Sequence, residues 1–443
     1  MIPMTVSFFL KQSKKKSQGV KNAFIYGFSI IAIYVILGLA INAAFGADAL
    51  NALSTSPWFN VAFFVLLLVF ATSFLGAFEI MLPNSWANSI DKQADKGGII
   101  GILFMALALA IVSFSCTGPI VGTLLVESAS KGGIAPIVGM LGFSSALALP
   151  FMLFALFPNW LKSLPKSGGW LNSVKVSLGF LELAFAFKFL SNADLVLQLH
   201  WLEREVFLAI WIAIFFTWAL YLFGKITLPH DSNSSSISVA RLLLALVVFS
   251  FTIYLVPGLF GAPLKLISAF PPPQTYSESP HGFLAPNAVS SQNIPKGAET
   301  GPHGIIIYTD YDLGLLAAKK ANKPVLIDFT GYACVNCRKM ENNVWSNERV
   351  LKILKNDLIL ISLYLDDKRS LPLNKQYISK QTNEKIITIG DKWTEFIITK
   401  YKTNTQPFYV LINLKEQNLI APISYTPNAD TYYNWLKSGL SEF

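Results

Sequence analysis

Seven apolar stretches in the first 260 residues most constrain what this chain can fold into. Each is long enough to cross a bilayer as a helix, which takes about 20 residues. In order, they cover residues 22–46, 58–82, 98–125, 134–157, 171–190, 206–224 and 239–260. Because a backbone in lipid must satisfy its own hydrogen bonds, these stretches predict a polytopic α-helical membrane domain over residues 1–260.

Composition supports a membrane domain followed by a soluble one. Only 14% of the 443 residues are charged and 53% are hydrophobic, whereas a soluble protein carries roughly a quarter charged residues. Lys and Arg number 15 before residue 261 and 20 in the shorter part after it. The net charge of +9 comes without a basic stripe interleaved with aromatics, so we expect no nucleic-acid partner.

The basic residues between the predicted spans indicate an orientation in the bilayer. One side carries Lys11, Lys14, Lys15, Lys16, Lys21, Lys92, Lys96, Lys162, Lys166 and Lys225, and the other carries only Lys131 and Arg204. The side richer in basic residues is normally cytoplasmic. Seven spans would then place the C-terminal part on the opposite face, the periplasm of a Gram-negative cell, with the chain multi-pass in the inner membrane.

A weak internal repeat lies within the spans. Residues 26–29, Tyr-Gly-Phe-Ser, are echoed by residues 141–144, Leu-Gly-Phe-Ser. A Pro-containing apolar segment precedes each copy, Met1-Ile2-Pro3 in one case and residues 116–119 in the other. Paired broken-helix segments of this kind are typical of transport sites, and if the repeat is real, the counterpart of Cys116 falls just upstream of Met1.

The part after the last span divides into a linker and a second domain. Residues 261–303 are rich in Pro, Ser, Asn and Gly and predict a semi-extended linker, or alternatively an ordered cap on the membrane domain. From residue 304 to 443, predicted helices at 312–322, from 334, at 393–401 and at the end alternate with predicted strands at 324–329, 358–365, 408–413 and 419–425. This order predicts an α/β layer of the thioredoxin-like kind.

Two of the three cysteines form a C-x-x-C motif that predicts redox chemistry. Cys334 and Cys337 follow a buried strand and open a helix, where backbone N–H groups stabilise a thiolate. Cys334 would attack and Cys337 would resolve the mixed disulfide. A structural zinc site is the alternative, but it takes four ligands and the chain has one other cysteine. We therefore expect neither a metal nor another cofactor.

Asp328 and Cys116 are the further candidates for chemistry. Asp328, in the strand ahead of the motif, would be buried with a raised pKa and could exchange the proton during thiol attack; alternatively it only bonds backbone. Cys116 precedes Gly118 and Pro119, which break a helix where backbone lines a cavity. This context favours a reactive thiol over a small buried hydrophobe.

Both ends of the chain resemble the DsbD-type thiol:disulfide interchange proteins. Residues 115–122, Ser-Cys-Thr-Gly-Pro-Ile-Val-Gly, resemble the second membrane cysteine motif of that family. Residues 328–339, Asp-Phe-Thr-Gly-Tyr-Ala-Cys-Val-Asn-Cys-Arg-Lys, resemble the motif of its C-terminal thioredoxin-like domain, and Gln406-Pro407 its cis-proline loop. The resemblance implies an electron relay from cytoplasmic thioredoxin through membrane cysteines to periplasmic thiol-disulfide proteins, including those of cytochrome c maturation.

The chain departs from the family pattern at its beginning. The resemblance implies a membrane domain of eight spans. The first of these spans would hold a Cys-Val-x-Pro motif, whose cysteine pairs with the counterpart of Cys116. Residues 1–6, Met-Ile-Pro-Met-Thr-Val, resemble the continuation of that motif without its cysteine. We therefore expect seven complete spans and the remnant of an eighth, because either the start is assigned too late or the chain is N-terminally truncated.

Three functional hypotheses follow. The first is a transmembrane protein-disulfide reductase in which Cys116 cycles between reduced and disulfide-bonded states. The second is a periplasmic thioredoxin-like reductase for which the membrane part is only an anchor, so that Cys116→Ser would be silent. The third is a carrier or scaffold with an incidental C-x-x-C, for which the pKa of Cys334 would stay near that of a free thiol.

Overall fold

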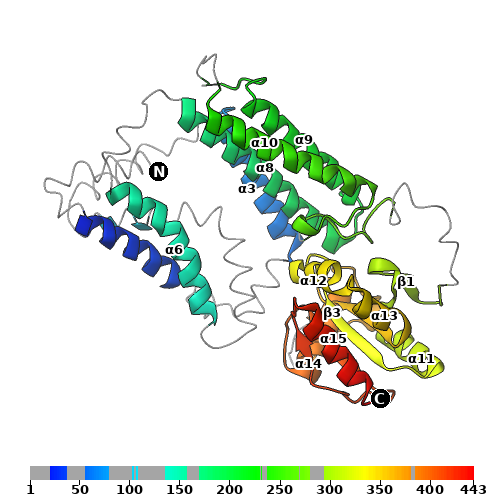
Figure 1. Cartoon of the computed structure of the whole chain (residues 1–443). Helices are drawn as coiled ribbons and strands as arrows, with labels where there is room; N and C mark the ends of the chain where they lie inside the picture. The colour runs from blue at the N-terminus through cyan, green and yellow to red at the C-terminus, as the bar shows by residue number, and fades with distance from the viewer. Residues whose placement is uncertain are drawn as a thin grey trace. The chain divides into compact units, whose positions relative to one another are not determined.

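A computed structural model shows the chain as two compact units. It describes residues 20–36, 55–78, 102–103, 106–107, 135–156, 169–229, 231, 237–268, 270–279, 294–380 and 385–443. One unit comprises Met1–Ser54, Val69–Gly179 and Leu228–Ser235, and the other comprises Thr55–Leu68, Phe180–Thr227 and Ser236–Phe443. Figure 1 shows the helices and strands of both.

Apolar helices make up the described part of residues 1–260. They are Val20–Ile36, α3 (Pro57–Phe74), α6 (Ala135–Leu156), α8 (Gly169–Leu197), α9 (Arg204–Leu222) and α10 (Val239–Leu255), which a 3₁₀ turn extends to Phe260. Three of them are long and apolar enough to span a bilayer: α3, α9 and the helix Val239–Phe260. Several apolar helices are therefore present, and they support a helical membrane domain without establishing seven spans.

Aromatic side chains and one arginine hold α9 and α10 together as a hairpin. Ser238 caps α10 by accepting a hydrogen bond from the backbone N–H of Arg241. The Arg241 guanidinium donates to the Tyr221 carbonyl over 2.6 Å and lies 5.1 Å from the Tyr221 ring centre. Phe215 and Phe251 meet edge to face with centroids 4.7 Å apart. Lipid tails are as apolar as these side chains, so burial alone does not drive two helices together in a bilayer. Specific aromatic contacts therefore contribute to the association of α9 with α10.

The two copies of the weak sequence repeat lie on helices that share one apolar cluster. The hydroxyls of Ser29 and Ser144 each donate to a carbonyl four residues earlier, over 2.7 and 2.6 Å. Gly27 allows close packing, because a Cβ there would lie 2.9 Å from Met152 Sδ, whereas a Cβ on Gly142 would meet nothing within 4 Å. The copies thus agree in local hydrogen bonding and differ in packing.

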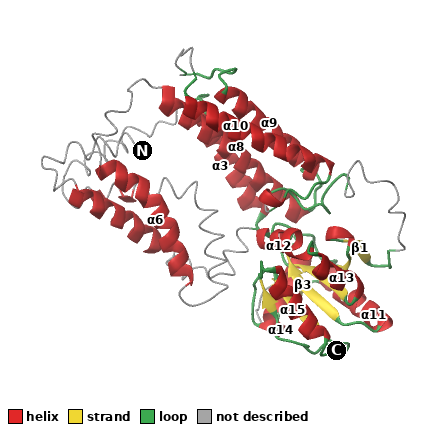
Figure 2. Cartoon of the chain, viewed as in Figure 1, coloured by secondary structure: helices red, strands yellow, loops and turns green. Residues whose placement is uncertain are grey.

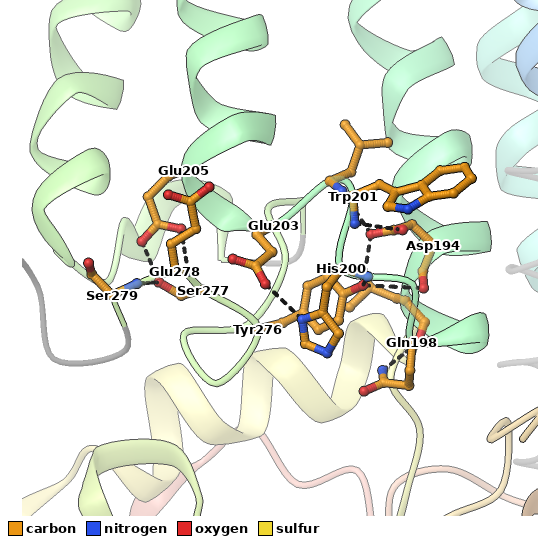
Figure 3. A network of polar contacts seen from close by, with 12 residues as sticks. Asp194, Gln198, His200, Trp201, Glu203, Glu205, Tyr276, Ser277, Glu278 and Ser279 are labelled. Carbon is orange, nitrogen blue, oxygen red and sulfur yellow. Dashed lines mark hydrogen bonds and ion pairs between the residues drawn. The ribbon is translucent and has the colours of Figure 1, made fainter.

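A polar network orders the chain after α10 (Figure 3). The buried Asp194 accepts hydrogen bonds from the Trp201 and Leu202 N–H groups over 3.2 and 3.0 Å, and from the Tyr276 hydroxyl over 2.8 Å. The Tyr276 hydroxyl in turn accepts from the His200 N–H over 2.7 Å. Burial and the bond to Asp194 raise the pKa of Tyr276 well above its usual value. Residues 270–279 are therefore fastened to the loop between α8 and α9.

The C-terminal domain is a six-stranded mixed sheet with helices on both faces (Figure 2). Its strand order is β1 (Ala298–Thr300), β2 (Ile306–Tyr308), β4 (Ile359–Tyr364), β3 (Val325–Thr330), β7 (Phe408–Ile412) and β8 (Ile423–Ser424). The central β3 pairs parallel with β4 and antiparallel with β7. All six of its residues are buried, which explains why the strand is apolar at every position except Asp328 and Thr330.

Helices cover the sheet in two layers. One apolar cluster joins the sheet to α11 (Tyr311–Ala321) and α14 (Ile389–Tyr401), and the other joins it to α13 (Glu348–Asn356) and α15 (Ala429–Leu440). The crossover from β3 to β4 runs through α12 (Val335–Met340), a π-helical turn (Glu341–Trp345) and α13. A mixed α/β thioredoxin-like domain is thus confirmed, although the predicted strand at 419–425 is only the two-residue β8.

Candidate dithiol site

The two C-x-x-C sulfurs lie where the central strand passes into a helix. Residues 331–333 form a turn after β3, and Cys334 is the N-cap of α12. Its Sγ accepts a hydrogen bond from the Cys337 N–H over 3.1 Å, and the two cysteines form a disulfide with Cα atoms 5.3 Å apart. Cys334 is partly exposed, whereas Cys337 is 1% exposed. A partner protein can therefore reach the Cys334 sulfur first.

Asp328 is a buried acid in the strand that leads to the dithiol. It is 2% exposed, and its Oδ2 accepts a hydrogen bond from the Ser362 hydroxyl over 3.1 Å. Its Oδ1 has no hydrogen-bond partner among the described residues. Burial, together with the negative charge of Glu341, raises the pKa of Asp328 to about 8. A carboxyl with such a pKa can hold or release a proton near neutral pH.

An ion pair is buried within the domain beyond the cysteines. Arg338 Nη2 and Glu341 Oε1 lie 2.8 Å apart, and both side chains are almost fully enclosed. Arg338 also donates to the Gly331 carbonyl over 3.3 Å. Burial raises the pKa of Glu341 to about 7, although the Arg338 charge opposes this shift. The pair links the helix after the dithiol to the turn before it.

The cis-proline loop closes over the same turn. The Gln406–Pro407 peptide bond is cis, as the sequence resemblance implies. The antiparallel register pairs Phe408 with Phe329, which brings this loop to the end of β3. A Cβ on Gly331 would lie 2.6 Å from Gln406 Oε1, so only glycine fits between the loop and the turn without displacing a neighbour.

The remaining predicted site residues, Cys116, Gly118 and Pro119, lie outside the described residues. Within the part of the chain that the structure describes, no cluster of His, Cys, Asp and Glu could hold a metal ion.

Two family models match the chain. The cytochrome c biogenesis protein transmembrane domain matches residues 1–193, and a thioredoxin-like domain matches residues 306–385. The dithiol lies within the second region, and the cis-proline loop follows that region in the sequence. The chain thus has the domain order of a DsbD-type protein, a membrane domain followed by a thioredoxin-like domain.

The relatives of this chain include proteins named thiol:disulfide interchange protein DsbD. The protein of Pseudoalteromonas atlantica is 25% identical over 80% of this chain and 55% of its own length. That of Campylobacter jejuni is 24% identical over 85% of this chain and 60% of its own length. That of Haemophilus influenzae is 31% identical over 49% of this chain and 37% of its own length. The DsbD-type chain thus spans about half the length of the curated relatives it matches.

Three charged residues near the dithiol were not predicted from the sequence of this DsbD-type chain: Arg338, Glu341 and Asp366. Glu341 follows Cys337 by four residues, a spacing that places two side chains on one helix face. Asp366 follows the strand predicted at 358–365, and the carboxyl ends of neighbouring parallel strands meet at one sheet edge. The Glu341 signal could have been read along the chain, because its partner Arg338 is three residues away, whereas the position of Asp366 requires the pairing of β3 with β4.

Proposed function

We propose that this chain is a protein-disulfide reductase that passes electrons through the membrane to the Cys334–Cys337 pair and on to disulfides of other proteins. The single observation that carries the proposal is the position of Cys334. It is a partly exposed sulfur at a helix N-terminus, bonded to a buried Cys337, in a chain that also matches a cytochrome c biogenesis membrane domain.

Disulfide exchange at this pair takes place in two steps, and in each step a thiolate attacks a disulfide. In the reduced protein, the Cys334 thiolate attacks a substrate disulfide, forms a mixed disulfide and releases one substrate thiolate. The Cys337 thiolate then attacks Cys334 Sγ, releases the second substrate thiolate and leaves the Cys334–Cys337 disulfide. Two electrons and two protons reach the substrate in all. Asp328, Pro407 and the turn at residue 331 are proposed to support these steps, with Asp328 taking or returning a proton.

The membrane part would restore the reduced pair. In this proposal Cys116, which the sequence places just before Gly118 and Pro119, belongs to a membrane dithiol that cytoplasmic thioredoxin reduces. We place the membrane domain at 1–260, the linker at 261–303 and the thioredoxin-like domain at 304–443. The loop charges favour a periplasmic C-terminal domain in the bacterial inner membrane, where periplasmic thiol-disulfide proteins, including those of cytochrome c maturation, would be its substrates.

A second candidate function is a membrane-anchored periplasmic reductase without transmembrane electron transfer. It is favoured by the position of both dithiol cysteines in the C-terminal domain. The partly exposed Cys334 and the buried Cys337 form a complete thiol-exchange pair without a membrane cysteine. Reducing equivalents would then have to reach Cys334 and Cys337 from another periplasmic thiol.

Acid-quenched thiol trapping in cells distinguishes these two functions. A maleimide-polymer gel shift would count reduced cysteines in the wild type and in Cys116→Ser, with and without cytoplasmic thioredoxin. A relay predicts that the Cys334–Cys337 pair becomes oxidised when thioredoxin is removed or Cys116 is replaced. If the pair stays reduced in both cases, transmembrane transfer is excluded and only the anchored reductase remains.

A further inference from the structure

Asp366 lies beside the dithiol turn although it is 32 residues from Cys334 in the sequence. The backbone continues the pairing of β3 with β4 by one bond, from the Leu365 N–H to the Thr330 carbonyl over 2.9 Å. This register brings the residue after Leu365 next to the turn that follows Thr330. The Asp366 side chain is 2% exposed, so its carboxylate needs partners within the protein.

Those partners are two consecutive N–H groups of the turn before Cys334. Tyr332 N donates to Asp366 Oδ1 over 2.8 Å, and Ala333 N donates to Oδ2 over 2.9 Å. A carboxylate can accept at both oxygens at once, whereas an amide side chain can accept at only one. The contact is also closely packed, because a Cβ on Gly331 would lie 2.9 Å from Asp366 Oδ2.

Aromatic and charged side chains hold the turn from another side. The rings of Tyr332 and Tyr364 stack with centroids 3.9 Å apart. The Tyr332 hydroxyl accepts a hydrogen bond from Arg369 over 3.1 Å, and Asp367 pairs with the same guanidinium over 2.6 Å. The turn therefore has little freedom of its own, and Asp366 supplies its two backbone bonds to β4.

We propose that Asp366 is a positioning residue for thiol exchange, which fixes the turn that presents Cys334 and, when ionised, places a negative charge against the residue before the attacking sulfur. The proposal rests on the proposed reductase function. A fixed negative charge nearby disfavours a thiolate. It therefore makes the dithiol a stronger electron donor, because the reduced form gains less from ionisation. This effect suits a protein that reduces disulfides.

Asp366→Asn in the full-length protein in detergent micelles tests the proposal, with Asp391→Asn as the matched control. Asp391 also accepts two backbone N–H bonds, from Thr388 and Ile387 over 2.9 and 3.2 Å, but it caps α14. Hydrogen exchange would report on the backbone amides of residues 332 and 333. The alkylation rate of Cys334, measured on its peptide at several pH values, would give the thiol pKa of Cys334. For Asp366→Asn we expect exchange at least about tenfold faster and a thiol pKa lower by about half a unit or more. Asp391→Asn should change neither.

Gly331→Ala supplies a second variant, in case Asp366→Asn does not fold. Its added Cβ would push the turn and the carboxylate apart while the charge remains. We expect faster exchange at residues 332 and 333 without a fall in the thiol pKa of Cys334. The proposal is overturned if the amides of residues 332 and 333 exchange as slowly in the folded variants as in the wild type. It is also overturned if the thiol pKa of Cys334 is unchanged in a folded Asp366→Asn. The reductase function is judged separately, because it fails only if Cys334→Ser retains disulfide reduction.

Discussion

Arg338 and Glu341 form a salt bridge of 2.8 Å with both side chains at least nine-tenths buried. One turn of helix separates them, and the same arginine reaches the carbonyl of Gly331. Charges buried in this way are costly unless they remain paired. The stability of the domain therefore depends on an ion pair that follows the dithiol and contacts the turn before it.

Arg338→Leu should destabilise the C-terminal domain by about 3–5 kcal/mol, because it leaves Glu341 buried without its partner. The urea midpoint of this domain, read by pulse proteolysis of the full-length protein, measures the change. Arg349→Leu is the control, since Arg349 and Asp430 form an ion pair at the surface and such pairs contribute about 0–1 kcal/mol. Equal losses in both variants would mean that the buried pair contributes no more than a surface one.

Cys337→Ser should trap a covalent complex between Cys334 and a substrate protein. The accessible sulfur of Cys334 can still attack, but the resolving thiol is missing. Non-reducing electrophoresis after incubation with a disulfide-bonded substrate would show the adduct. Cys334→Ser should give no adduct, because Cys337 is 1% exposed. Adducts of equal yield in the two variants would contradict the assignment of Cys334 as the attacking residue.

Asp328→Asn should stabilise the C-terminal domain at pH 7 and have progressively less effect toward pH 4. The folded state holds the pKa of Asp328 at about 8, compared with about 3.9 in an unfolded chain. Between these values the unfolded chain releases a proton that the folded protein keeps, so the wild type loses stability as the pH rises through this window. Above pH 8 the gain from the substitution should level off.

Urea midpoints measured by pulse proteolysis at several pH values would show this dependence. Asp312→Asn, which removes an exposed carboxylate from the first turn of α11, controls for the change in net charge. A gain in Asp328→Asn that is the same at pH 4 and pH 7 would show that burial does not raise the pKa of this carboxyl.

Asp194→Asn should loosen the chain between residues 270 and 279 from the α8–α9 loop. An amide cannot accept all three of the hydrogen bonds that the buried carboxylate receives, so one donor loses its partner at a cost of about 1–3 kcal/mol. Hydrogen exchange of residues 200–202 and 276 should accelerate. Asp231→Asn, which alters a carboxylate bonded to Asn172 and the Leu228 N–H, should leave these amides unchanged.

The sequence predicted much of the thioredoxin-like domain because its signals are local. The mostly apolar strand at 325–330, the C-x-x-C after it and the helix at 311–321 each carry their own pattern. The strands β1 and β2 escaped prediction because three residues are too few for a period to show. The sequence left two alternatives for residues 261–303, a linker or an ordered cap, because the contact that orders residues 270–279 joins Tyr276 to Asp194, 82 residues earlier.

By itself, the sequence determined that this chain has an apolar helical part and an α/β part with a dithiol, because hydrophobic period and motif spacing are written along the chain. Only the tertiary structure decided which groups surround that dithiol. Asp366 meets the turn before Cys334 through the parallel register of β3 and β4, and Gly331 meets Gln406 through the antiparallel register of β7. Strand pairing joins residues that no sequence period relates, and therefore the electrostatic setting of Cys334 is a property of the fold.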